Sequence, residues 1–234
     1  MPEVVFATYN IHGGLGGDGR RDLARIARVL AALDCDVVAL QEVANRLAGS
    51  GQEVQADFLA ESLQMDVVRG PTLLRGDEDF GNALLTRLPL RALRRLDLSE
   101  TGREPRGALD VELEKHGRPL RLIATHFGLR PWERRRQVRR LLEQIPRSPV
   151  RPLILLGDLN EWLPGSRPLR WLVREFGAAS GIPTFPARRP LLALDRVLVT
   201  PGSALVALQA LSGGEASLAS DHLPLWGRVR LVPD

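Results

Sequence analysis

Short apolar runs separated by polar, glycine and proline breaks recur along most of the chain, and this pattern predicts many strands joined by tight turns. Each run has the length of a single strand and is followed by residues that favour turns. The predicted strands cover residues 3–9, 37–40, 65–69, 82–86, 108–114, 120–125, 153–156, 194–200, 204–211 and 223–231. Strands therefore outnumber helices in the prediction.

Helical periodicity occurs in fewer segments. Leu23, Ile26 and Leu30 recur on one face of residues 20–33, and another helix is predicted around residues 52–64.

A further helix is predicted from Pro131 to about Ile145, with Pro131 at its first position. Its apolar face consists of Val138, Leu141, Leu142 and Ile145, and its opposite face of Arg134, Arg135, Arg136, Arg139 and Arg140. A charged helix face usually contacts only solvent. The alternative is that these arginines flank a basic groove that leads to a site for a polyanion.

The order of these elements predicts an α/β fold, in which two sheets form a β-sandwich core and helices cover its outer faces, giving four layers. The stretch between the predicted strands 153–156 and 194–200 is expected to be loop-rich. Residues 1–234 are expected to form one domain, because the proline-rich connector 146–152 is short and lies between apolar segments.

The charge balance adds one hint about partners. The chain has a net charge of +4 and a pI near 10.3, and Lys115 is its only lysine. Guanidinium groups suit bidentate contacts with phosphate, although a genome rich in arginine codons would give the same bias. Charge alone therefore does not establish binding of nucleic acid.

The cysteine count and the N-terminal sequence bear on location. Cys35 is the only cysteine, which excludes an intramolecular disulfide, and its apolar neighbours predict that it is buried. The first ten residues, MPEVVFATYN, have the pattern of a strand and not of a signal peptide. No apolar run approaches the roughly 18 residues of a transmembrane helix, so a cytoplasmic protein without membrane insertion is expected.

Acids, amides and histidines gather at the ends of the predicted strands. They are Asn10 in TYNIHGG, Glu42 in LQEV, His126 in ATHFG, Asp158 and Asn160 in GDLN, Asp195 in LDRVLV, and Asp221 and His222 in SDHLPL. A single such residue is most often a turn former or a structural hydrogen-bonding group. Their repetition at separate strand ends favours a functional site, because a rigid scaffold presents catalytic groups there.

These residue types indicate a particular chemistry. Oxygen ligands without cysteine favour Mg²⁺ or Mn²⁺ over zinc. Such an ion stabilises charge on a phosphoryl group, and a histidine beside a carboxylate can exchange a proton near neutral pH. The pattern therefore predicts a metal-dependent enzyme that cleaves a phosphate ester with water.

The motifs TYNIHGG, LQEV, FGNALLTRLP, ATHFG, GDLN, LDRVLV and SDHLPL, in this order, resemble those of the endonuclease/exonuclease/phosphatase superfamily. The resemblance spans residues 4 to about 226. That superfamily includes pancreatic-type deoxyribonucleases, abasic-site endonucleases, neutral sphingomyelinases and inositol-polyphosphate phosphatases. Its substrates are phosphate esters, and DNA and RNA are among them.

The resemblance implies roles for individual residues. Glu42 matches the principal metal-binding glutamate, with Asn10 beside it and Asp221 as a further acidic residue near the metal. Asp158 matches the residue that orients or deprotonates the attacking water. Asn160 matches its partner, which contacts the phosphate.

The remaining matches concern histidines and phosphate contacts. Asp195 and His222 match a carboxylate–histidine pair, in which the histidine acts as base or charge stabiliser. His126 occupies the place of the second histidine of the deoxyribonuclease-like branch, and Arg106 resembles a phosphate-contacting arginine there. Asn82 is a candidate to form a hydrogen bond with His126 or with the phosphate. A purely structural role for its amide within the strand is an equal alternative.

The motifs also depart from part of the superfamily. The repair endonucleases carry an acidic residue two positions after the first-strand asparagine, where this chain has His12. This departure argues against abasic-site activity. The favoured reaction is hydrolysis of a phosphodiester, with nucleic acid among the candidate substrates. The alternatives are a phosphomonoesterase for a sugar or inositol phosphate, and an arginine-rich nucleic-acid binder without activity. The sequence leaves the substrate and the oligomeric state open.

Overall fold

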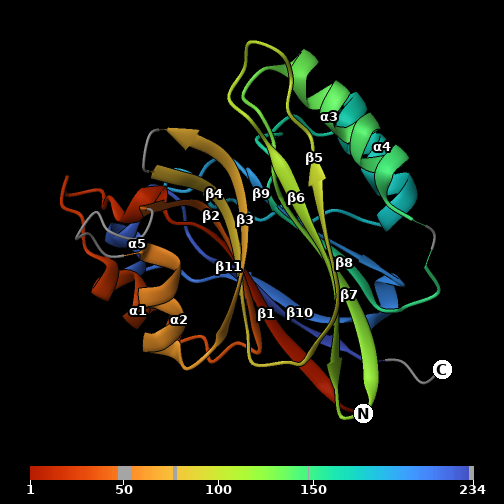
Figure 1. Cartoon of the computed structure of the whole chain (residues 1–234), viewed down its shortest axis with the longest axis horizontal. Coiled ribbons are helices and arrows are strands. Elements are labelled where there is room, and N and C mark those ends of the chain that lie inside the picture. Colours follow the sequence, from red (N-terminus) through yellow and green to blue (C-terminus); the bar gives the residue numbers. More distant parts are fainter. Residues whose placement is uncertain (47–53, 76–77, 147, 232–234) are drawn as a thin grey trace.

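Two β-sheets packed face to face form the centre of the protein, and helices lie on the outer side of each sheet (Figure 1). The computed structural model of the chain describes residues 1–46, 54–75, 78–146 and 148–231.

The strands are β1 (Glu3–Asn10), β2 (Val37–Arg46), β3 (Asp66–Arg75), β4 (Glu78–Thr86), β5 (Leu90–Asp97), β6 (Gly107–Lys115), β7 (Arg118–His126), β8 (Leu153–Asp158), β9 (Asp195–Thr200), β10 (Leu205–Ala210) and β11 (Leu225–Arg230). The helices are α1 (Leu23–Ala31), α2 (Gln55–Leu63), α3 (Pro131–Gln144), α4 (Arg167–Phe176) and α5 (Ala216–Ala219), with 3₁₀ turns at η1 (His12–Gly14) and η2 (Gly202–Ala204).

The order of the strands brings several strand ends to one edge. One sheet has six strands in the order β10-β11-β1-β2-β4-β3, and the other has five in the order β5-β6-β7-β8-β9. The pairs β1–β2 and β7–β8 are parallel, so their carboxyl ends lie together. The antiparallel neighbours β11 and β9 begin at the same edges.

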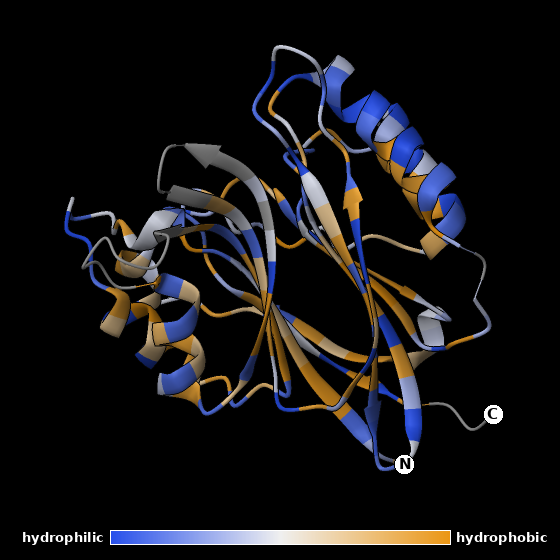
Figure 2. Cartoon of the chain, viewed as in Figure 1, coloured by the Kyte–Doolittle hydropathy of each residue, from blue (hydrophilic) through white to orange (hydrophobic). Residues whose placement is uncertain are grey.

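Three apolar clusters hold these layers together. Between the sheets, Phe6 and Leu84 pack with Val111, Leu122 and Ile154 from the opposite sheet. Separate clusters fasten α1 and α2 to the six-stranded sheet, and α3 and α4 to the five-stranded sheet. Figure 2 shows the same division, with hydrophobic residues along the strands and on the inner sides of the helices. The predicted four-layer α/β fold is therefore confirmed.

Two of the longer elements, β5 and α4, were not predicted. β5, with the sequence LRALRRLD, lies at the edge of its sheet and pairs only with β6. Because an edge strand has little to bury, its sequence shows no apolar alternation. α4 lies in the stretch predicted to be loop-rich. Its Leu169, Leu172 and Phe176 have helical spacing, but the prolines and glycine around them favoured the prediction of a loop.

Other boundaries differ by a few residues. β2 extends beyond the predicted end at Leu40 as far as Arg46, through an irregularity described below. The predicted helix 52–64 begins at Gln55, and residues 52–53 lie outside the described residues. Cys35 is buried, as predicted. Within the described ranges, no helix is long and apolar enough to cross a membrane.

Candidate active site

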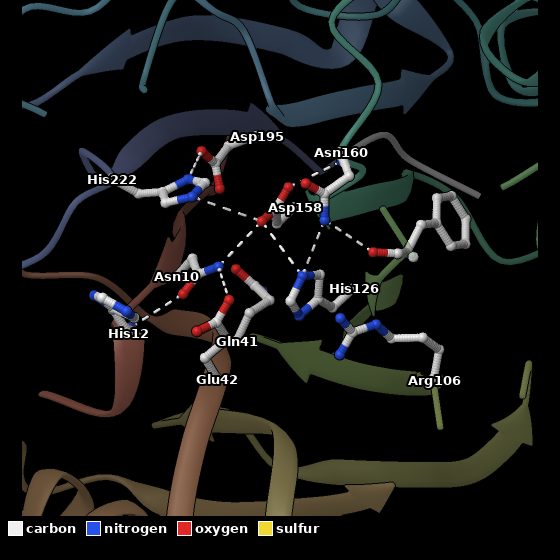
Figure 3. A network of polar contacts seen from close by, with 12 residues as sticks. Asn10, His12, Gln41, Glu42, Arg106, His126, Asp158, Asn160, Asp195 and His222 are labelled. Carbon is white, nitrogen blue, oxygen red and sulfur yellow. Dashed lines mark hydrogen bonds and ion pairs between the residues drawn. The ribbon is translucent and has the colours of Figure 1, made fainter. Parts of the chain in front are cut away.

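The polar residues predicted at strand ends converge at one edge of the two sheets (Figure 3). Asn10 and Glu42 come from β1 and β2 of the six-stranded sheet. His126, Asp158 and Asp195 come from β7, β8 and β9 of the other sheet. Asn160 follows β8, and Asp221 and His222 precede β11. The site therefore lies where the carboxyl ends of the parallel pairs meet.

Asn10 connects the two sheets. Its side-chain Nδ2 donates to Glu42 Oε1 over 2.9 Å and to Asp158 Oδ2 over 3.0 Å. Its Oδ1 accepts a hydrogen bond from the backbone N–H of His12, which fixes the orientation of the amide. With 1% of its surface exposed, Asn10 holds the carboxylates of opposite sheets close together.

Glu42 projects toward the site from an irregular part of β2. The register of β2 against β4 shifts between Leu40 and Val43, and Glu42 has a φ of 55°. A bulge of this kind redirects a side chain, and a left-handed non-glycine residue is typical of functional positions. Burial raises the pKa of Glu42, as do the charges of Asp158 and Asp221, against the lowering effect of the Asn10 hydrogen bond.

Asp158, Asn160 and His126 form the centre of the site. The backbone N–H of Asn160 donates to Asp158 Oδ1 over 2.9 Å. The Asn160 side-chain nitrogen donates to the Phe127 carbonyl over 2.9 Å and lies 3.2 Å from His126 Nε2. The same ring nitrogen lies 3.4 Å from Asp158 Oδ2. These contacts fix the Asp158 carboxylate between an amide and an imidazole.

The two central histidines have opposite tendencies to bind a proton. Burial, together with the charges of Arg106 and His222, lowers the pKa of His126 to about 3, although Asp158 opposes this. Burial also lowers the pKa of His222, but the charge and hydrogen bond of Asp195, with the charges of Asp158 and Asp221, outweigh it and raise this pKa to about 10. His126 is therefore neutral near pH 7, and His222 is an imidazolium.

The Asp195–His222 pair is held from several sides. Asp195 Oδ2 lies 2.7 Å from His222 Nδ1 and also accepts a 2.5 Å hydrogen bond from the Thr184 hydroxyl. The Phe185 ring packs against the imidazole with a centroid distance of 4.9 Å. These contacts aim His222 Nε2 at Asp158 Oδ2, which is 3.8 Å away.

Asp221 lies at the more exposed side of the site. Its Oδ1 is 3.6 Å from His12 Nδ1, and both side chains are about 40% exposed. Ser220 donates to the Asn10 carbonyl over 2.8 Å and contacts Asp221 Oδ1 at 3.3 Å. Ser220 thereby joins the segment before β11 to the end of β1.

The predicted phosphate contacts lie in different places. Arg106 is 7% exposed and lines the same cavity as the residues above, with its Nη1 2.7 Å from Glu104 Oε1. Asn82 donates to the Gly107 carbonyl over 3.0 Å and lines a neighbouring cavity. Among the described residues, the Asn82 amide does not contact His126.

The site opens into a cavity of about 340 Å³. The charged and polar wall consists of Glu42, Glu104, Arg106, His126, Asp158, Asn160, Asp221 and His222, and the apolar wall of Phe80, Leu129, Phe185 and Leu194. A cavity lined by both charged and apolar side chains suits a ligand that carries an anionic group on a less polar body.

The donor atoms also suit a hard cation. Glu42, His126 and Asp158 each offer a ligand atom, and these atoms lie within 4.8 Å of one another. Only one Glu42 oxygen accepts a hydrogen bond within the described part of the chain, which leaves the other free for an ion. A binding cation would also relieve the repulsion among Glu42, Asp158 and Asp221 that raises the pKa of Glu42. The residues present therefore fit a divalent metal.

Sequence reasoning missed two residues that support the site. Thr184 lies between β8 and β9 in a stretch where no periodicity points to it. Ser220 was part of the quoted motif SDHLPL, and its position directly before Asp221 was the available signal. Both act through hydrogen bonds to residues that the motifs did identify.

Comparisons with known proteins give a consistent result. Residues 7–222 match the Endonuclease/Exonuclease/phosphatase family. The chain is 32% identical over 241 residues to the uncharacterized protein YbhP of Escherichia coli (strain K12), covering 96% of this chain and 95% of YbhP. An endonuclease/exonuclease/phosphatase crystal structure from Beutenbergia cavernae has a TM-score of 0.78 and 25% identity, over 99% of this chain and 72% of that chain.

The fold is also similar to that of D. rerio TDP2 complexed with single strand DNA product. The TM-score is 0.70 with 16% identity, over 98% of this chain and all (100%) of that chain. At this identity the likeness concerns the fold alone.

The matched region contains the strand-end residues from Asn10 to His222 that converge at the site. The resemblance drawn from the motifs is thereby confirmed. The chain belongs to the endonuclease/exonuclease/phosphatase family.

Proposed function

We propose that this protein is a metal-dependent phosphodiesterase that hydrolyses its substrate by in-line attack of water. Membership of a family of metal-dependent phosphoesterases supports the general reaction. The observation that carries the proposal is the Asn10 amide, which joins the Glu42 and Asp158 carboxylates while His222 approaches the same Asp158 oxygen. A metal ligand, a base and a charge stabiliser are thus held together.

Glu42 is the principal ligand of the metal in this proposal, with Asn10 and Asp221 beside it. Bound Mg²⁺ or Mn²⁺ would supply a Lewis acid that stabilises negative charge on the phosphoryl group. Carboxylate and amide oxygens are the donors that these ions prefer, which is why we favour them over zinc.

Asp158 orients the attacking water and takes its proton. The Asn160 backbone N–H and the Asn10 amide each hold one of its carboxylate oxygens, so its position is fixed before substrate binds. Preorganised donors of this kind lower the barrier because they need no rearrangement during the reaction. Asn160, His126 and Arg106 line the same cavity, and in this proposal they contact the non-bridging phosphate oxygens.

His222 stabilises developing charge. Its raised pKa, which results from Asp195, Asp158 and Asp221 overcoming burial, keeps it protonated near neutral pH. A protonated imidazole cannot act as a base. Of the two roles that the family resemblance allows, charge stabilisation is therefore the one that we propose, with Asp195 fixing the orientation of the ring.

Nucleic acid is a candidate substrate, since TDP2, which has this fold, was captured with single strand DNA product. The arginine face of α3 gives little support to the hypothesis that the substrate is a nucleic acid. Arg134 is buried against Glu161, and Arg136 and Arg140 pair with Glu100, so much of their charge is compensated. A DNA or RNA groove on α3 would make binding strongly dependent on salt.

The proposal is tested with phosphodiesters and phosphomonoesters, each assayed with Mg²⁺, Mn²⁺ or excess chelator. Diester hydrolysis should require metal and should be lost in Glu42→Gln. Glu61→Gln, an exposed carboxylate on α2, is the matched control and should keep wild-type activity. Full turnover in chelator would overturn the metal requirement. Preference for monoesters would favour the phosphomonoesterase alternative.

A further inference from the structure

A second cavity adjoins the active site. It has a volume of about 390 Å³ and is lined by residues of β3 and β4 of one sheet and of β5 and β6 of the other. β6 contacts both β3 and β4 across the sandwich, and Figure 1 labels these strands. The polar residues that line it include Thr72, Asn82, Arg95, Asp97, Ser99 and Arg106. None of them except Arg106 takes part in the proposed hydrolysis.

Arg106 is the wall between the two cavities, since it lines both. Its side chain is nine-tenths buried, yet among the described residues its guanidinium pairs only with Glu104, through Nη1. The Nε–H is buried without a hydrogen-bond acceptor. A buried guanidinium with unused donors is costly unless an acceptor completes it. This points to an acceptor-rich ligand near Arg106.

Arg95 supplies further donors on the far side of this groove. Its Nε donates to the Arg69 carbonyl over 2.8 Å, which holds the side chain in place. Within the described ranges its terminal nitrogens have no partner. The adjacent Arg94 pairs with Asp110 and does not line the groove.

Glu104 pairs with Arg106 from outside the groove lining, and Arg95 has no ion-pair partner among the described residues. Asp97 is the carboxylate among the described residues that line the groove, and its Oδ1 already accepts a hydrogen bond from the Ser99 backbone N–H. Asn82 and Thr72 present their polar groups to backbone carbonyls of Gly107 and Phe80. The free donors in the groove are therefore mainly the two guanidinium groups, which prefer phosphate or carboxylate.

We propose that this groove, lined by Arg95 and Arg106, binds a second phosphate group of the substrate while the scissile phosphodiester occupies the active site. The proposal rests on the proposed function, because it assigns a preferred substrate class to that site: phosphodiesters that carry an additional phosphate. A nucleic-acid strand has this chemistry, and so does the diester of a phosphorylated sugar or inositol.

The proposal is tested by direct binding in excess chelator, where turnover is not needed. The probes are thymidylyl-thymidine with no terminal phosphate, with a 5′-phosphate and with a 3′-phosphate. A second pair is glycerophosphoinositol with and without a ring phosphate. Wild type should bind at least one phosphorylated probe about tenfold more tightly than its unphosphorylated counterpart, the scale of a charge-assisted contact. The pair that responds identifies the source of the second phosphate.

Arg95→Gln should abolish this preference without changing binding of the unphosphorylated probe. Arg91→Gln, on the same strand and paired with the exposed Glu114, should keep the preference. Equal affinity of wild type for every probe and its unphosphorylated counterpart, or an undiminished preference in Arg95→Gln, would overturn the proposal. Hydrolysis of bis-p-nitrophenyl phosphate by the same preparation reports separately on the proposed function.

Discussion

At the scale of single residues, the site contains two buried histidines whose surroundings act in opposite directions. Burial, followed by the charges of Arg106 and His222, lowers the pKa of His126, whereas Asp195, Asp158 and Asp221 outweigh burial at His222 and raise its pKa. Identical side chains thus become a neutral hydrogen-bonding group and a cation. This division is set by the neighbours that folding brings together, and so it cannot be read from either histidine's sequence context.

These pKa values predict how stability depends on pH. An unfolded histidine titrates near pH 6.5, but folded His126 binds a proton only near pH 3, so lowering the pH from about 6.5 favours unfolding. His222 behaves oppositely: its stabilisation is complete below about pH 6.5 and is lost as the pH rises toward 10. Urea denaturation at pH 5, 6.5, 8 and 9.5 measures both limbs.

His126→Asn should flatten the acid limb relative to wild type, and His222→Gln should flatten the alkaline limb. His126→Asn should leave the alkaline limb unchanged, whereas His222→Gln should also reduce the acid limb somewhat, because the charge of His222 helps to lower the pKa of His126. Parallel pH profiles for wild type and both variants would contradict the assigned protonation states.

Thr184 is expected to position the Asp195–His222 pair. Thr184→Val keeps the shape of the side chain but removes the hydrogen bond to Asp195 Oδ2, so the imidazole loses its fixed orientation. We expect kcat for a phosphodiester to fall by about tenfold with KM little changed, and Thr184→Ser to restore it. An equal loss in the Ser and Val variants would mean that Thr184 matters for packing and not for its hydroxyl.

At the scale of elements, α3 shows how a charged helix can carry buried charge. Its sequence predicts an arginine face opposite an apolar face, but Arg134 and Gln137 are buried. Arg134 Nε lies 3.2 Å from Glu161 Oε2, and its Nη1 donates to the carbonyls of Gly128 and Leu129. The helix therefore ties together the loops that follow His126 and Asn160.

Arg134→Ala should destabilise the fold by about 3 kcal/mol, because Glu161 would keep a buried charge without its partner. Arg139→Ala, on the exposed face of the same helix, should change stability by less than about 0.5 kcal/mol. Urea denaturation compares the two. Similar small losses of the free energy of unfolding in both variants would show that solvent can take the place of Arg134 beside Glu161.

The elements that sequence predicted are those with a clear period or an uninterrupted apolar run. β8 and β7 are buried over most of their length, so LILLGD and RPLRLIATH show apolar runs. Among the described strands, β5 pairs with β6, and backbone hydrogen bonds at a sheet edge require no particular hydrophobic pattern in the sequence. The bulge at Glu42 is likewise absent from LQEV, because it depends on the register that β4 imposes.

At the scale of the whole molecule, the site exists only where the two sheets meet. Sequence order supplied the set of strand-end residues, whose convergence Figure 3 shows. The second cavity could not be predicted from the sequence, because Arg95, Asn82 and Arg106 come together only when one sheet packs on the other. Motifs therefore indicate the candidate site residues, whereas a cavity formed by tertiary packing is visible only in the structure.

A divalent metal at Glu42 should stabilise the whole fold, because binding to the folded state alone shifts the unfolding equilibrium. At a hundredfold excess over Kd the gain is about 2.7 kcal/mol, which corresponds to a rise in Tm of about 5 °C or more for a chain of this size. Mn²⁺ titration followed by differential scanning calorimetry measures this rise. Glu42→Gln should abolish it, and an identical rise in that variant would place the stabilising ion elsewhere.

The chain's path between the sheets has a consequence for synthesis. It builds β1 to β4 in one sheet, crosses to β5 through β9, and returns to the first sheet with β10 and β11. Asp221 and His222 directly precede β11, which pairs with β1, so they are the last residues of the candidate site to be translated and positioned. A nascent chain is therefore expected to lack the proposed activity until β11 docks beside β1. Fragments that end before Asp221 lack the last residues of the site, so they are expected to lack the proposed phosphodiesterase activity.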